Sequence, residues 1–137
     1  MAQDINYDFA TGPTVTLLSS DLTDGSQSAF TSTVDFGTPT PVGFGYELIL
    51  TTLASSTGKC ALQVAWSHDN SDFSDADNAQ NVAFVQCTAS TDKKKVGSSA
   101  IMARYAKFRL DNQSGGSIDG TASNTALILT DISIDQV

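Results

Sequence analysis

The stretch FGYELILT, residues 44–51, has an apolar side chain at every second position from Phe44 to Leu50. A period of two is typical of a β-strand with one buried face and one outward face. Turn-forming pairs and triplets such as Asp24-Gly25 and Ser114-Gly115-Gly116 interrupt the pattern, and no segment has a helical period. The chain is therefore predicted to be all-β. Further strands are expected at residues 14–17, 30–36, 60–66, 82–87, 105–110 and 128–134.

The 137 residues correspond to one domain, long enough to bury a core without metal or disulfide staples. Short strands between turns predict an antiparallel β-sandwich, jelly-roll-like, of about seven to eight strands. We expect residues 1–13 to form a short N-terminal arm and residues 14–137 to form the sandwich. No apolar run is long enough to cross a bilayer, and the first residues lack a signal-peptide pattern. Synthesis in a cytoplasm, with no membrane partner, is expected.

Apolar side chains also fall on the faces that this pattern places outward. If the isoleucines of residues 128–134 point inward, the leucines at the two positions next to Ile128 must point outward. A contiguous exposed apolar surface in a soluble protein usually marks an interface. Self-association is therefore predicted through Ile49, Leu53, Leu127 and Leu129.

The charges are distributed unevenly along the chain. The net charge is −8, yet six of the seven cationic residues lie within residues 93–109, where no acid occurs. A basic island on an acidic protein is a candidate contact surface for a negatively charged partner, whereas the overall balance argues against nucleic acid. We expect the three lysines to lie in a loop beside a strand that carries the other members. The predicted contact residues are Lys93, Lys94, Lys95, Tyr105, Lys107 and Arg109.

Two cysteines, Cys60 and Cys87, are too few for a disulfide framework, and their spacing matches no zinc motif. Buried thiols that pack as small apolar groups are one interpretation. A cross-strand disulfide is the other, because a hairpin with Trp66 opposite Asn81 would place the two cysteines opposite each other.

The chain has a single histidine, His68. No nucleophile elbow or oxyanion-loop signature accompanies it, so we expect a solvated loop histidine and no enzyme. The neighbouring loop, residues 69–77, has four carboxylates but lacks the glycine and glutamate of an EF-hand. Asx turns are predicted there, followed by one helical turn in residues 74–81 capped by Ser74. No metal or cofactor is predicted.

Three aromatic residues have two interpretations. Trp66, Tyr46 and Tyr105 together could form a platform on which a sugar stacks. The alternative places Trp66 and Tyr46 in the core. The pattern leaves a glycan ligand open.

Several segments together resemble a known family. The strand Val64-Ala65-Trp66-Ser67 precedes an Asp/Asn-rich loop, residues 103–112 read ARYAKFRLDN, and an apolar strand closes the chain. Across most of residues 14–134, this resembles the cement or decoration proteins on the outer surface of tailed-bacteriophage heads. The resemblance implies a non-enzymatic, trimeric β-sandwich that binds the major capsid protein on the virion exterior after synthesis in the host cytoplasm.

Two other classes remain open, because similar strands occur in tail and carbohydrate-binding sandwiches. One is a carbohydrate- or receptor-binding module associated with a virion or tail. The other is a hydrolase in an unfamiliar sandwich.

Overall fold

The computed structural model describes residues 5–121 and 125–136 of the chain. Eight strands and one short 3-10 helix occur in these residues, and none of their helical structure is long and apolar enough to span a membrane. The elements are β1 (Ile5–Val15), β2 (Val34–Asp35), β3 (Gly43–Thr51), β4 (Lys59–Ser67), η1 (Ala76–Asn78), β5 (Gln80–Gln86), β6 (Asp92–Ala100), β7 (Tyr105–Gln113) and β8 (Ala126–Gln136).

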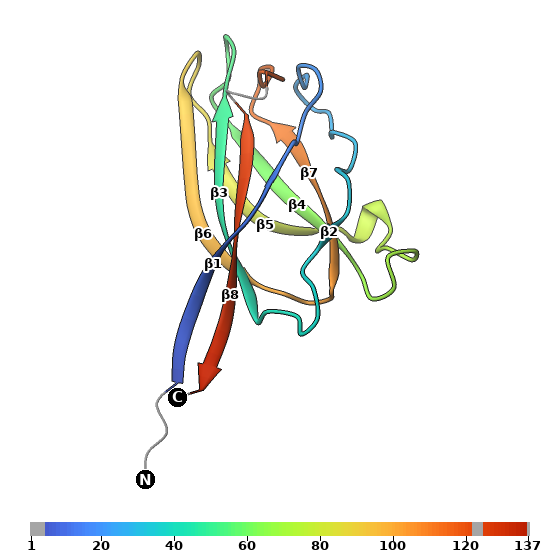
Figure 1. The fold of residues 1–137 in the computed structure, drawn as a ribbon. Helices are drawn as coiled ribbons and strands as arrows, with labels where there is room; N and C mark the ends of the chain where they lie inside the picture. The colour runs from blue at the N-terminus through green and yellow to red at the C-terminus, as the bar shows by residue number, and fades with distance from the viewer. Residues whose placement is uncertain (1–4, 122–124, 137) are drawn as a thin grey trace.

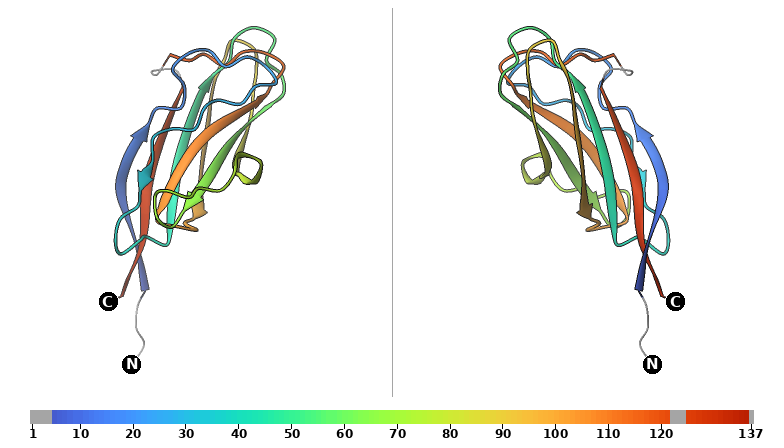
Figure 2. Two further views of the ribbon diagram at one scale, coloured as in Figure 1. Left: turned by 90° about the vertical axis from the view of Figure 1, so that its right-hand side faces the viewer. Right: turned by 90° about the vertical axis from the view of Figure 1, so that its left-hand side faces the viewer.

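The strands form two four-stranded antiparallel sheets, ordered β1-β8-β3-β6 and β2-β7-β4-β5. Most consecutive strands lie in opposite sheets, which is the arrangement of a jelly roll. Figure 1 shows the strands of both sheets, and Figure 2 shows the two layers facing each other. The predicted all-β, jelly-roll-like sandwich is confirmed.

The core lies between the two sheets and centres on Phe44, which is fully buried. Its ring centroid is 5.6 Å from that of Phe36, 5.8 Å from that of Phe108 and 6.1 Å from that of Trp66. Trp66 and Phe108 belong to the sheet opposite β3, so the aromatic cluster joins both layers. The alternation in residues 44–51 therefore identified the inward face of β3 correctly.

The expected arm is largely part of the first sheet. Residues 5–15 form β1 and pair with β8, with an irregularity between Thr11 and Thr14. Pro13 fits this position because an edge strand tolerates a residue without an N–H donor. Beyond Ile132, which pairs with Gly43 of β3, β8 pairs with β1 alone, and the two strands project past the sandwich (Figure 1). Residues 1–4 of the expected arm lie outside the described residues.

Two strand assignments from the sequence were wrong. Lys93–Lys95 lie in β6, a nine-residue strand at the edge of its sheet, and not in a loop. The lysines concealed this strand because they break the apolar alternation, although lysine is common on edge strands, where it discourages pairing with other chains. Conversely, only Val34 and Asp35 of the predicted strand 30–36 pair as a strand.

The predicted faces of β8 were inverted. Leu127 and Leu129 are fully buried, because they lie opposite Leu48 and Tyr46 of β3 on the inward side. Their predicted outward position and role in self-association are therefore wrong. Residues 127–129 at the start of β8 are apolar on both faces, so the sequence pattern there did not indicate which face is turned toward the core.

The pairing of β4 with β5 differs by two residues from the predicted hairpin register. Cys60 lies opposite Val85, and not opposite Cys87. Both residues remain on the inward side as buried free thiols, which agrees with their interpretation as small apolar groups. Burial raises the pKa of the Cys60 thiol to about 12 and also raises the pKa of Cys87.

Both thiols should resist modification in the folded protein. The thiolate is the reactive form, so burial and a raised pKa slow the reaction with Ellman's reagent at about pH 8. We expect almost no released chromophore from the native protein and two thiols per chain after urea is added without a reductant. Fewer than two thiols in urea would indicate a disulfide instead.

Candidate interaction surface

The outer face of the sheet β1-β8-β3-β6 carries a continuous set of apolar side chains. Tyr7 and Phe9 of β1 lie opposite Ile134 and Ile132 of β8, so the four residues share one face. Tyr7 is 63% exposed and Phe9 is 65% exposed. We call this surface the apolar face and define it by Tyr7, Phe9, Val96, Ile128, Ile132 and Ile134.

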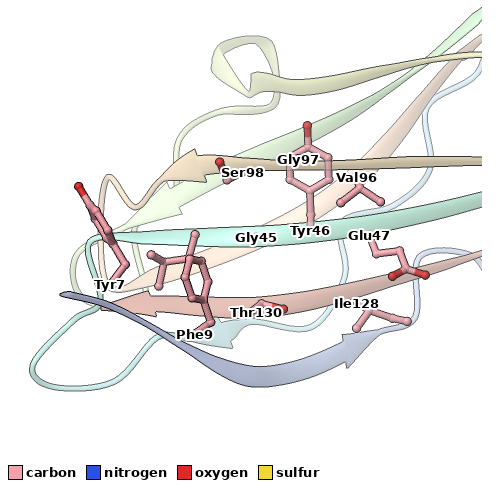
Figure 3. A pocket seen from close by; sticks show the side chains of 11 residues that line it. Tyr7, Phe9, Gly45, Tyr46, Glu47, Val96, Gly97, Ser98, Ile128 and Thr130 are labelled. Atoms are coloured by element: carbon pink, nitrogen blue, oxygen red, sulfur yellow. The ribbon is translucent and has the colours of Figure 1, made fainter. Parts of the chain in front are cut away.

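A shallow groove of about 580 Å³ crosses the apolar face. Its lining includes the small residues Gly45 and Thr130 and the carboxylate of Glu47. Figure 3 shows Tyr7 and Phe9 on one side of Gly45, and Val96 of β6 on the other side. The face therefore presents an aromatic ridge on β1 next to a groove.

The charges on this side of the sheet nearly balance. Glu47 of β3 and Lys94 of β6 form an ion pair with a 3.2 Å separation, and Thr51 donates a hydrogen bond to Asp92. The six residues of the apolar face are uncharged, and the charged side chains beside them, Glu47 and Lys94, are paired with each other. Of the predicted self-association residues, Ile49 is half-buried on β3 and Leu53 is exposed just beyond its end.

The predicted basic contact residues do not form one surface. Lys93, Lys94 and Lys95 lie on β6, whereas Tyr105, Lys107 and Arg109 lie on β7 of the other sheet. Lys94 is engaged with Glu47, and alternation along β6 points Lys93 and Lys95 to the opposite side from Lys94. Although these residues are close in sequence, they do not form a single basic patch in the structure.

Arg109 is only 6% exposed, so the expectation of an exposed cation at this position is wrong. Its Nε donates to Oε1 of Gln63 at 2.7 Å, and its Nη2 donates to the Ala76 carbonyl oxygen at 2.9 Å. The guanidinium also lies 4.7 Å from the ring centroid of Phe30. These contacts attach the segment around η1 to the outer face of β4 and β7.

Two other predicted contact residues on β7, Lys107 and Tyr105, also take part in cation–aromatic contacts. The Lys107 ammonium nitrogen lies 4.3 Å from the ring centroid of Phe73, in the loop that precedes η1. Tyr105 is half-buried, and the Arg104 guanidinium lies 5.0 Å from its ring centroid. Lys107 and Arg109 therefore help to position the loop.

The aromatic platform does not form. Trp66 and Tyr46 are both buried in the core, as the alternative interpretation predicted. The indole Nε1 of Trp66 donates to Oε1 of Gln80 at 3.0 Å. Tyr105 alone of the three retains substantial exposure.

The loop after β4 forms the predicted Asx turn. Oδ1 of Asp69 accepts hydrogen bonds from the backbone N–H groups of Asp72 and Ser71 and from the Ser67 hydroxyl. These donors, led by the N–H of Asp72, lower the pKa of Asp69 to about 2. His68 is exposed, and the described residues contain no cluster of potential metal ligands. The helical turn begins after Asp75 and not after Ser74.

The pKa of Asp69 predicts a local dependence of stability on pH. A carboxyl whose pKa is lower in the folded state stabilises the fold above its ordinary pKa of 3.8, and this contribution is lost as the pH falls toward about 2. We expect Asp69→Asn to reduce the decrease of the urea midpoint between about pH 4 and about pH 2. Asp72→Asn is the control, and equal acid sensitivity of all three proteins would contradict the assignment.

Sequence reasoning missed Tyr7 and Phe9 as surface residues. Both residues were assigned to the N-terminal arm, although Ile5, Tyr7 and Phe9 alternate with other residues as in a β-strand. This period of two was the available signal, and the adjacent Gly12-Pro13 pair obscured it because such pairs usually mark a turn.

Comparison with known proteins gives a likeness of fold alone. No family model matches the chain, and no curated protein matches its sequence. Among solved structures, the fold is similar to the crystal structure of murine APRIL, with a TM-score of 0.53 and 6% sequence identity over 92% of this chain and 99% of that chain. The chain therefore has a jelly-roll-like β-sandwich fold.

Proposed function

We propose that the chain is a non-enzymatic structural protein of a tailed-phage virion, bound as a homo-oligomer to the outer surface of the capsid. Its partners are further copies of itself, in the trimeric arrangement that the family resemblance implies, and the major capsid protein. The observation that carries this proposal is the apolar face, because a contiguous exposed apolar patch on a small acidic protein marks an interaction surface.

The size of the sheet suits a stable interface. Four strands about 4.8 Å apart, with about 3.3 Å per residue along the nine residues of β3, span roughly 19 Å by 30 Å. This is ~570 Å² in projection, and a standard interface buries roughly 800 Å² of accessible surface on each partner. Because side chains protrude from the sheet, its accessible area is larger than this projected area. An interface of standard size would therefore cover most of the face.

The shape and the charge of the apolar face favour another copy of the same chain as its binding partner. The Tyr7–Phe9 ridge and the groove over Gly45 occur on the same surface, so each copy supplies both a projection and a recess. Copies with a net charge of −8 repel one another wherever acidic surfaces meet. Contact through the neutral apolar face avoids most of that repulsion.

Attachment to the capsid is the second part of the proposal. Lys95 of β6 is exposed and forms no ion pair with another described residue, so it remains available to an acidic capsid surface. The test adds the purified chain to capsids that lack it and measures the bound copies by sedimentation across a salt series. We expect co-sedimentation at a fixed ratio, decreasing with salt because exposed charges are screened over about 8–10 Å.

Lys95→Glu should reduce the bound fraction, whereas Lys59→Glu, the same change at an exposed position on the other sheet, should have little effect. A chain that stays in the supernatant at every salt concentration would refute the capsid role. Equal binding of both variants and the wild type would place the capsid contact elsewhere on the chain.

A further inference from the structure

A second, polar pocket lies on the outer face of the sheet β2-β7-β4-β5. Its volume is about 180 Å³, or roughly six water molecules at ~30 Å³ each, which matches the size of one sugar ring. We call it the Arg109 pocket. It is lined by Gln27, Gln63, Ala76, Asp77, Ala79 and Arg109.

The donors in the Arg109 pocket are held in place before any ligand arrives. Arg109 uses its Nε and one Nη2 hydrogen to bind Gln63 and Ala76, which leaves further guanidinium N–H groups uncommitted. The Gln63 amide is fixed in turn, because its Nε2 donates to Oδ1 of Asn81 at 3.0 Å. Arg109 forms no ion pair within the described part of the chain. A nearly buried guanidinium with spare donors therefore borders an open pocket.

Two other polar groups of the pocket are free to bind. The side chains of Gln27 and Asp77 are exposed, and neither forms a hydrogen bond with another residue that the structure describes. Asp77 supplies acceptor oxygens, and the Gln27 amide supplies both donors and an acceptor. The pocket thus offers fixed donors, free acceptors and the methyl groups of Ala76 and Ala79.

The charges select a neutral ligand. An anion attracted by Arg109 would meet the Asp77 carboxylate, and a cation attracted by Asp77 would meet Arg109. A hydroxyl group can donate to a carboxylate and accept from a guanidinium, and adjacent hydroxyls on a ring do both at once. The C–H groups of such a ring would pack against the alanine methyls. We propose that the Arg109 pocket binds one saccharide unit, either free or within a glycan.

The experiment is a titration of the intact, isotope-labelled protein followed by NMR. The probes are glucose, galactose, mannose and N-acetylglucosamine, up to about 50 mM, a concentration that saturates a site with a Kd of about 1 mM. We expect at least one sugar to shift the Arg109 Nε–H signal and the side-chain amides of Gln27 and Gln63, with saturation. No shift of these signals with any of the four sugars would overturn the proposal.

Two variants test whether the sugar binds in the Arg109 pocket. Asp77→Ala should weaken binding of that sugar by about tenfold or more, the expected cost of a lost hydrogen bond to a charged group. Asp75→Ala changes a neighbouring exposed carboxylate that does not line the pocket, and it should change affinity by less than about twofold. Equal weakening by both variants, or shifts caused by acetate or sulfate and not by sugars, would refute a saccharide site. The pocket and the apolar face lie on different sheets, so failure here leaves the proposed assembly role intact.

Discussion

Replacing Phe44 with alanine should reduce the free energy of unfolding by about 3–5 kcal/mol, the range observed for fully buried phenylalanines. Phe44 is fully buried and lies within 6.4 Å, between ring centroids, of Phe36, Tyr46, Trp66 and Phe108. Because these rings come from both sheets, they cannot all move to fill the space that the missing ring leaves. Urea unfolding followed by tryptophan fluorescence measures the change, since Trp66 is part of the same cluster.

Phe84→Ala is the matched control for this measurement. It removes the same ring from a position on β5 that is 52% exposed, so the expected loss is below ~1 kcal/mol. Similar losses from both substitutions would contradict the central position of Phe44 in the core.

If the chain self-associates through the apolar face as proposed, replacing both Tyr7 and Phe9 with aspartate should leave a 14.3 kDa monomer. Aromatic residues at the centre of an interface typically contribute about 2 kcal/mol or more each. The double substitution also places like charges face to face. We expect self-association to weaken by at least about a hundredfold. Light scattering and sedimentation equilibrium over the micromolar range measure the mass.

Phe84→Asp provides the control, because it introduces the same charge at an exposed aromatic position of the other sheet. It should leave the mass of the oligomer unchanged. A wild-type protein that remains monomeric at all concentrations would refute self-association. Dissociation by Phe84→Asp alone would place the interface on the sheet β2-β7-β4-β5.

The sequence by itself determined the fold class and the centre of the core. Alternation from Phe44 to Leu50 was sufficient, because every inward residue there is apolar and the outward positions are mixed. The Asx turn at Asp69 could also be predicted from the sequence, because hydrogen bonds between a side chain and the neighbouring backbone depend only on local sequence.

Only the tertiary structure decided which apolar face is exposed. At the start of β8, Ile128 lies between Leu127 and Leu129, so a period of two divides these side chains into two apolar sets without indicating which set the second sheet covers. Pairing with β3 places Leu127 opposite Leu48 and turns Ile128 and Ile132 to the outside. The apolar face, and with it the proposed interface, therefore depends on long-range strand pairing.

The positions of the cations were likewise set by topology. Lys95 and Arg109 are close in sequence, but β6 and β7 belong to different sheets, so the turn between them separates the two charges. Burial of Arg109 requires Gln63 from β4 and the Ala76 carbonyl from η1, and local sequence does not show that these groups converge. Alternation specifies the strands and their two faces, whereas strand order and loop packing decide which charges are exposed and which form a pocket.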